Sequence, residues 1–150
     1  MTTQVIHFLA IVFLALIFAP AAAHAFALMN KISMSQQDYY TAQLAYRRWD
    51  IFGWPYLGAL IFTLWLALAS RGGAPAVLWL SAVAFGMTAL SLVIFFIWVF
   101  PGNAATKNWT VAPENWEVLR FRWEWGHFGS ALANFLALCA AAAAATIARQ

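Results

Sequence analysis

The sequence contains very little charge. Only 9% of its 150 residues are Asp, Glu, Lys or Arg, whereas 65% are hydrophobic and 17% are aromatic. Soluble domains have about 25% charged residues, so a water-soluble fold of this composition would expose a largely apolar surface. The net charge of +3 is also too small for a surface that binds polyanions. The composition therefore excludes a soluble secreted module, a disordered tail and a nucleic-acid-binding protein, and it predicts an integral membrane protein.

Cysteine and the common enzyme motifs are scarce as well. The single cysteine, Cys139, excludes an internal disulfide and lies in an alanine-rich apolar run. The sequence has no glycine-rich phosphate loop, no nucleophile elbow and no Cys-x-x-Cys pair. These absences argue against the familiar classes of soluble enzyme. The sequence specifies neither a cofactor nor an oligomeric state.

The hydrophobic residues gather in four stretches that are each long enough to cross a membrane. They cover residues 5–28, 51–70, 76–100 and 128–147. A helix of about 20 apolar residues spans the ~30 Å hydrocarbon core, and none of the stretches shows the alternating polarity of a barrel strand. We therefore predict an all-α four-helix membrane bundle that forms a single domain over residues 1–150, with the lipid bilayer as its partner.

The first stretch has an alternative interpretation as a secretory signal. Ala23-His24-Ala25 resembles the small-residue site at which signal peptides are cleaved. The stretch lacks the basic residues that usually precede a signal peptide's apolar region, and it is longer than such regions normally are. We therefore expect the stretch to remain as a spanning helix.

Two of the three connections are long and carry nearly every charge. They span residues 30–50 and 101–126, and four spanning helices place both on one side of the membrane with both termini on the other. Ser35 and Asp38 have the spacing of a capping box, so we expect a helix to run from there into the second span. Pro113 suits the first turn of the fourth helix. Helices two and four would then each have about 35 residues and extend beyond the bilayer on one side.

Polar side chains gather at that end of the predicted bundle. Arg120, Glu124 and His127 are spaced by four and three residues, so they share one helix face, which continues to Asn134. Polar groups at membrane depth are costly, and a cluster of them indicates a functional site. Six residues would meet at this membrane face: His24, Asn30, Asn103, Arg120, Glu124 and His127.

The pair Glu124 and His127 presents a carboxylate and an imidazole on one helix face. Together with His24 it would supply two histidines and one carboxylate, which is the ligand set of non-haem iron oxygenases. The alternative is that Glu124 balances Arg120 or Arg48 and that His127 only makes a hydrogen bond. A di-iron bundle would need a second Glu-x-x-His motif, which the sequence lacks. The residues alone leave the metal site and the ion pair open.

The segment between the third and fourth spans carries a distinctive set of residues. It consists of Pro101-Gly102-Asn103, Trp109, Pro113, Trp116, Arg120, Trp123 and His127. A second set lies in the first half of the chain: His24, Asn30, Lys31, Gln43, Tyr46 and Arg47. The first set resembles the anthrone-oxygenase-like family of small four-helix membrane proteins, and the second is similar to a bacterial branch of that family.

The resemblance implies an oxygenase of the bacterial inner membrane that converts anthrones to anthraquinones without a conventional cofactor. Its substrate would be a flat aromatic or phenolic molecule that partitions into lipid. His127 or His24 would remove a proton, and polar side chains nearby would hold the anionic oxygen. The expected catalytic set is His127, His24, Arg120, Asn103, Asn30 and Glu124. The expected substrate-binding set is Trp123, Trp116, Tyr46 and Asn134.

A non-catalytic function is the alternative. In this interpretation the bundle is a membrane scaffold or accessory protein, and its charged connections dock a partner. Ion pairs at helical spacing, such as Arg47 with Asp50 or Glu117 with Arg120, would then form a solvated collar without catalytic activity.

Overall fold

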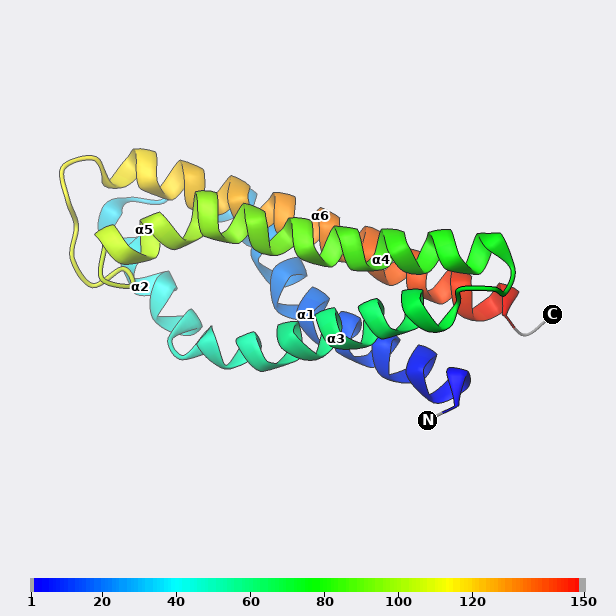
Figure 1. Ribbon diagram of the computed structural model, residues 1–150. Coiled ribbons are helices and arrows are strands. Elements are labelled where there is room, and N and C mark those ends of the chain that lie inside the picture. The colour runs from blue at the N-terminus through cyan, green and yellow to red at the C-terminus, as the bar shows by residue number, and fades with distance from the viewer. Residues whose placement is uncertain (1, 149–150) are drawn as a thin grey trace.

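A computed structural model describes residues 2–148, and this range consists of helices and their connections without strands (Figure 1). The α-helices follow the chain in this order: α1 (Thr3–Lys31), α2 (Gln36–Gln43), α3 (Gly53–Ala69), α4 (Pro75–Ile94), α5 (Phe100–Ala105) and α6 (Trp116–Ile147). The prediction of an all-α bundle is confirmed.

Four segments of the bundle are long and apolar enough to cross a membrane. They are Thr3–Lys31, Trp49–Ala69, Pro75–Ala105 and Trp116–Ile147. Large apolar side chains such as Phe8, Trp79 and Leu132 are exposed on their outer faces, where lipid rather than water would cover them at no cost. The architecture is that of a multi-pass membrane protein.

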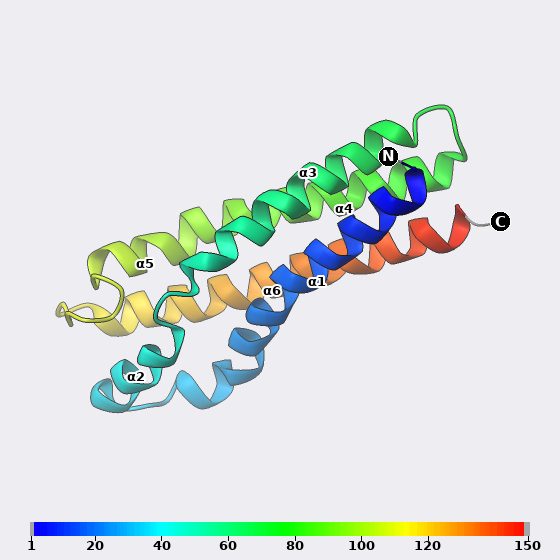
Figure 2. The same cartoon turned by 90° about the horizontal axis from the view of Figure 1, so that it is seen from below.

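The four long helices pack in a ring, with α1 and α4 each contacting both α3 and α6. Small side chains fill much of the space between them, which allows the helices to approach closely. The central core cluster is Leu14, Ile17, Ala59, Ala84, Ala137, Ala140 and Ala141. Both termini and the α3–α4 link lie at one end of the bundle, and α2 and α5 lie at the other (Figures 1 and 2). Both long connections therefore emerge on the same side, as the sequence predicts.

The second helix is interrupted, and the prediction of one continuous rod is wrong there. Its start is as predicted, because the Asp38 N–H donates to Ser35 Oγ at 3.2 Å and caps α2. After Gln43, however, the chain forms two short 3-10 turns separated by Arg48, whose φ of 68° lies in the left-handed region. A right-handed helix cannot continue through such a residue. The spanning helix α3 therefore restarts at Gly53.

The fourth helix is continuous, as predicted, and α6 runs for 32 residues from Trp116 to Ile147. It begins three residues later than expected. Pro113 lies in the preceding turn, where its carbonyl accepts a hydrogen bond from the Trp116 N–H at 3.0 Å. The fourth helix therefore extends well beyond the apolar stretch at 128–147.

The third span contains a π-helical turn at Phe95–Val99, between α4 and α5. This wider turn packs directly against α6 at Gly126. A Cβ built on Gly126 would lie 2.9 Å from Trp98 Cβ and 2.9 Å from Val99 Cγ2. Because Trp98 Cβ is fixed to the backbone, a larger residue would push the helices apart. The absence of a side chain at Gly126 thus sets the distance between α6 and the third span.

We predict that Gly126→Ala lowers the stability of the bundle. Overpacking of this kind costs roughly 1–3 kcal/mol, which exceeds the gain of up to about 1 kcal/mol from replacing glycine in a helix. Gly129→Ala is the matched control, because its added Cβ would meet Ile94 at an ordinary 3.7 Å. Thermal unfolding in detergent, followed by circular dichroism, should give a lower midpoint for Gly126→Ala than for Gly129→Ala. Equal midpoints would contradict the tight packing described here.

Candidate functional site

A cavity of about 1240 Å³ occupies the end of the bundle where the long connections emerge. Its lining comes from α1, from residues 43–60, from residues 92–110 and from α6. Most of the lining residues are apolar or aromatic, and more than a third are polar or charged. A large cavity that combines apolar walls with polar groups is a usual form of a small-molecule site.

Two histidines stack against each other in the wall of this cavity. The ring centroids of His24 from α1 and His127 from α6 are 4.1 Å apart, and the rings are inclined by 23°. His24 is only 5% exposed, and its Nδ1 has no hydrogen-bond partner within residues 2–148. Two positive charges at this separation would repel strongly, so the pair is suited to hold one proton at most. The predicted meeting of the two imidazoles is confirmed.

Aromatic rings surround the His24 imidazole. The rings of Tyr46, Trp49 and Trp123 lie 4.2, 5.3 and 4.9 Å from it, and Trp123 also packs edge-on against His127 at 4.2 Å. All of these residues line the cavity. The enclosure keeps the imidazole pair largely away from water and offers flat apolar surfaces to a ligand.

Asn103 lines the cavity with a fixed orientation. Its Oδ1 accepts hydrogen bonds from Trp123 Nε1 at 2.7 Å and from Trp109 Nε1 at 3.3 Å. Indole nitrogens can only donate, so the amide oxygen must face them. The Asn103 Nδ2 group makes none of the side-chain hydrogen bonds found within residues 2–148, and it remains available as a donor to a ligand.

A strained turn holds Trp109 in place beside this amide. Lys107, Asn108 and Trp109 have φ values of 48°, 56° and 62°, which is a rare left-handed run for residues other than glycine. Two hydrogen bonds secure the run: Asn108 N–H donates to the Asn103 carbonyl at 2.7 Å, and Trp109 N–H donates to Thr106 Oγ1 at 2.9 Å. The Trp109 ring is thereby placed 5.7 Å from that of Trp123.

A buried ion pair lies behind the Trp123 ring. Lys31 Nζ is 2.9 Å from Glu124 Oε1, and the two side chains are 3% and 0% exposed. The same oxygen accepts a hydrogen bond from the Tyr39 hydroxyl at 3.0 Å. The Lys31 ammonium also lies over the Tyr46 and Trp123 rings, at 4.7 and 5.0 Å from their centroids. This pair ties the end of α1 to α6 and to α2.

Tyr39, which is buried, and Tyr46, which is half-buried, are both held in their neutral form. Burial raises the pKa of Tyr46, and the negative charge of Glu124 raises it further. The pKa of Tyr39 is raised by the same two causes, with burial the larger. Since an ordinary phenol already titrates near pH 10, both hydroxyls keep their protons at neutral pH. Tyr39 uses its proton to stabilise the Glu124 carboxylate.

Tyr56 provides a hydroxyl elsewhere in the cavity wall. It accepts a hydrogen bond from Asn134 Nδ2 at 2.7 Å, and Ser91 Oγ lies 3.5 Å away. Asn134 is fully buried and does not itself line the cavity. Its predicted contact with a ligand would therefore be indirect, through the hydroxyl of Tyr56.

Several of the predicted site residues lie outside the cavity. Asn30 is exposed at the end of α1 and is not part of the lining. Arg120 donates to the Met34 carbonyl at 2.7 Å, and its guanidinium lies 4.5 Å from the centre of the Trp116 ring. Neither Arg120 nor Trp116 lines the cavity. The expected grouping of Arg120 and Asn30 around Asn103 is wrong, because the rotation of each helix directs them elsewhere.

The alternative iron site is also not formed. Within residues 2–148 no three His, Cys, Asp or Glu side chains are placed to hold a metal ion, so His24, Glu124 and His127 do not act together as ligands. The physical reason is the ion pair, which engages the Glu124 carboxylate with Lys31. The prediction that Glu124 balances a cation is correct in kind, but the partner is Lys31 rather than Arg120 or Arg48.

Four residues at this end have contacts for which the sequence predicted no site role: Lys31, Tyr39, Trp49 and Tyr56. The sequence signal for Lys31 is its spacing of seven residues from His24, which places the two side chains on the same face of a helix. In the structure this face of α1 is buried and includes Ile17, Ala21, His24, Leu28 and Lys31. No comparable pattern precedes Trp49, which lies in a 3-10 turn.

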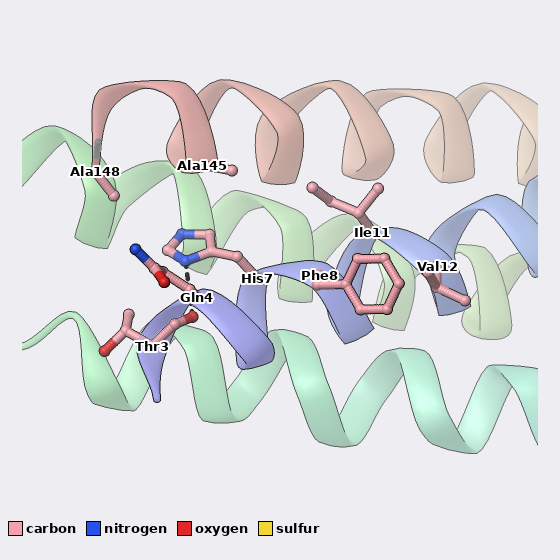
Figure 3. Close-up of a pocket in the computed structure, with 8 residues that line it drawn as sticks. All are labelled: Thr3, Gln4, His7, Phe8, Ile11, Val12, Ala145 and Ala148. Atoms are coloured by element: carbon pink, nitrogen blue, oxygen red, sulfur yellow. Dashed lines mark hydrogen bonds between the residues drawn. The ribbon is translucent and has the colours of Figure 1, made fainter. Parts of the chain in front are cut away.

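A second, smaller cavity of about 190 Å³ lies at the opposite end of the bundle, between the start of α1 and the end of α6 (Figure 3). His7 is buried beside it and uses Nδ1 to donate to the Thr3 carbonyl at 3.1 Å. Its other lining residues include Phe8, Ile11 and Ala145. His7 is the one titratable residue among the described residues that line this cavity, and its hydrogen bond stays within α1.

Comparisons with protein-family models, with curated proteins and with solved structures find no match for the chain.

We predict that Lys31→Met destabilises the bundle by about 3–5 kcal/mol, because it leaves the Glu124 carboxylate buried without its cation. The double variant Lys31→Met/Glu124→Gln should recover much of this loss, since the neutral amide still accepts the Tyr39 hydroxyl. Unfolding by denaturing detergent, analysed as a double-mutant cycle, would measure the coupling between the two residues. We expect a coupling of about 2 kcal/mol or more.

Lys107→Met is the control, because it removes an exposed lysine and should change stability by less than about 0.5 kcal/mol. Strictly additive effects of Lys31→Met and Glu124→Gln would show that the buried pair does not hold α1 against α6.

Proposed function

We propose that the protein is a membrane-embedded oxygenase that acts on a lipid-partitioning aromatic substrate of the anthrone type. The observation that carries this proposal is the stacked pair of His24 and His127 in the wall of an aromatic-lined cavity. The resemblance to the anthrone-oxygenase-like family supplies the reaction. The same resemblance favours the bacterial inner membrane as its location.

The cavity is suited to a substrate that arrives from the lipid. Its lining includes Leu57 on α3 together with Phe96 and Phe100 on the third span, and all three side chains are exposed on the bundle surface. Exposed apolar residues in the wall of a cavity offer an entrance that faces the acyl chains rather than water. A flat hydrophobic molecule could enter there and pack against Trp49 and Trp123.

The imidazole pair is suited to act as a general base. An anthrone carries an acidic CH₂ group next to two aromatic rings, and its deprotonation gives an anion delocalised onto the carbonyl oxygen. His24 or His127 would accept the proton, with the second imidazole holding the first in place. The free Nδ2 donor of Asn103 is suited to hold the oxygen that gains the negative charge. Arg120 and Asn30 have no part in this scheme.

Dioxygen then oxidises the anion in two steps. The carbanion forms a C–O bond with O₂, and the resulting peroxide anion takes a proton from the imidazolium, which gives a hydroperoxide. Loss of the remaining C–H proton breaks the O–O bond, forms the second carbonyl and releases water. One anthrone and one O₂ thus give one anthraquinone and one H₂O, and O₂ is the oxidant.

We predict that His127→Ala reduces anthrone oxidation by at least about 100-fold, which is the usual contribution of a general base. His24→Ala should have a similar effect. His7→Ala is the matched control, because this buried histidine lies in the small cavity at the other end of the bundle. Anthraquinone formation and oxygen uptake above the spontaneous rate would be measured on folded protein in nanodiscs.

Unchanged oxidation by a folded His127→Ala protein would end the proposal. A scaffold, by contrast, would tolerate both histidine variants and would lose its partner when the charges of the long connections are reversed.

A further inference from the structure

We infer that the cavity binds an aromatic molecule that carries an anionic group, and that this group lies among basic side chains at the edge of the cavity. The inference rests on the proposed function and specifies the class of substrate further. Three exposed cations line the cavity, Arg47, Arg48 and Lys107, and together they form its charged edge. The fold brings them together from two distant segments of the chain.

These cations are not neutralised by the protein. Asp50 is the single acidic residue in the cavity lining. Within residues 2–148 the ion pair between Lys31 and Glu124 is the only one closer than 4.0 Å, so none of the three cations is paired with a carboxylate there. An excess of positive charge beside a mostly apolar cavity attracts an anion whose other end is hydrophobic.

A buried hydrogen-bond donor, the side-chain amide of Gln43, lines the same cavity. Gln43 is 6% exposed, and its amide nitrogen lies beside the Tyr39 hydroxyl without forming a well-aligned hydrogen bond in the described part of the chain. A buried donor of this kind is costly unless a ligand or water accepts its hydrogen bond. Gln43 therefore offers a neutral donor to a ligand in the same cavity that the three cations line.

The backbone holds two of the cations on strained turns. Arg48 and Lys107 both have positive φ values, 68° and 48°, although neither is glycine. A residue forced into this region costs of order 1 kcal/mol or more, and such strain tends to gather at ligand sites. The turn that contains Lys107 is held by a hydrogen bond from the Asn108 N–H to the backbone carbonyl of Asn103. The same contact therefore positions Lys107 and Asn103, whose side-chain amide is the proposed donor.

The expected ligand is therefore an aromatic carboxylate whose rings lie between the tryptophans and whose carboxylate lies at the charged edge. A carboxylate fits the donor set because Arg, Lys and Gln amide groups can all donate to its two oxygens. The headgroup of an anionic lipid offers the same charge, and the experiment separates these two sources.

The test compares two probes of the same shape, anthracene-2-carboxylate and its neutral carboxamide. Binding to the full chain would be measured by equilibrium dialysis in phosphatidylcholine nanodiscs, independently of any oxidation. We expect the wild type to bind the carboxylate about tenfold more tightly than the carboxamide, which corresponds to about 1.4 kcal/mol. In Arg47→Gln/Lys107→Gln this preference should fall to about twofold, with carboxamide binding unchanged.

Arg71→Gln/Arg122→Gln is the matched control, since it removes two exposed positive charges from positions outside the cavity. It should keep the tenfold preference. Equal binding of both probes by the wild type would overturn the inference, and so would an equal loss in the control variant.

Two further outcomes separate the inference from related explanations. If phosphatidylglycerol in the nanodiscs abolishes carboxylate binding to the wild type, the charged edge holds a lipid headgroup and the inference is overturned. If the carboxylate preference is present but anthrone is not oxidised, the binding inference stands and the proposed reaction fails.

Discussion

The buried ion pair between Lys31 and Glu124 is the constraint on which the arrangement of the site depends. It joins the last residue of α1 to α6 at a point where neither charge can reach water. Because α1 and α6 run in opposite directions, this contact sets which of their residues meet. His24 lies two turns before Lys31 and His127 lies one turn after Glu124, so the ion pair and the stacked imidazoles are neighbouring contacts between the same two helices. Tyr39 extends the constraint to α2 through its hydrogen bond to the carboxylate.

Much of the fold could be predicted from the sequence because lipid imposes simple requirements. A segment without charges and about 20 residues long has few alternatives to a spanning helix, and four of them dictate where the connections lie. The break at Arg48 could not be predicted in this way. Capping and hydrophobicity predict where helices begin and where they can run, but a left-handed residue in a polar connection leaves no periodic signal. The later start of α6 at Trp116 is a displacement of one turn at a helix end, where such predictions are least accurate.

The candidate site was predictable in part. Helical spacing placed His127, Glu124 and Arg120 on one face, and the topology placed His24 at the same end. The spacing did not say which of these residues would turn toward the cavity, because that depends on the rotation of each helix against its neighbours. Arg120 turns toward the Met34 carbonyl and the Trp116 ring instead. Contacts made by residues in irregular turns, such as that of Trp49 with His24, lie beyond any pattern in the chain.

The π-helical turn at 95–99 has a consequence for the angular position of Asn103. Ser91, buried within the bundle, precedes Asn103 by twelve residues. In a regular α-helix twelve residues leave the two side chains roughly 120° apart around the axis, at about 100° per residue. A π turn accommodates one additional residue and so reduces this offset to roughly 20°. The insertion thus brings an amide from the end of the third span onto the inner face of the bundle, where both indoles can reach it. The same twelve residues wound as a regular α-helix would turn Asn103 toward the lipid, whereas deletion of one residue from the π turn would restore a regular helix and keep Asn103 on the inner face.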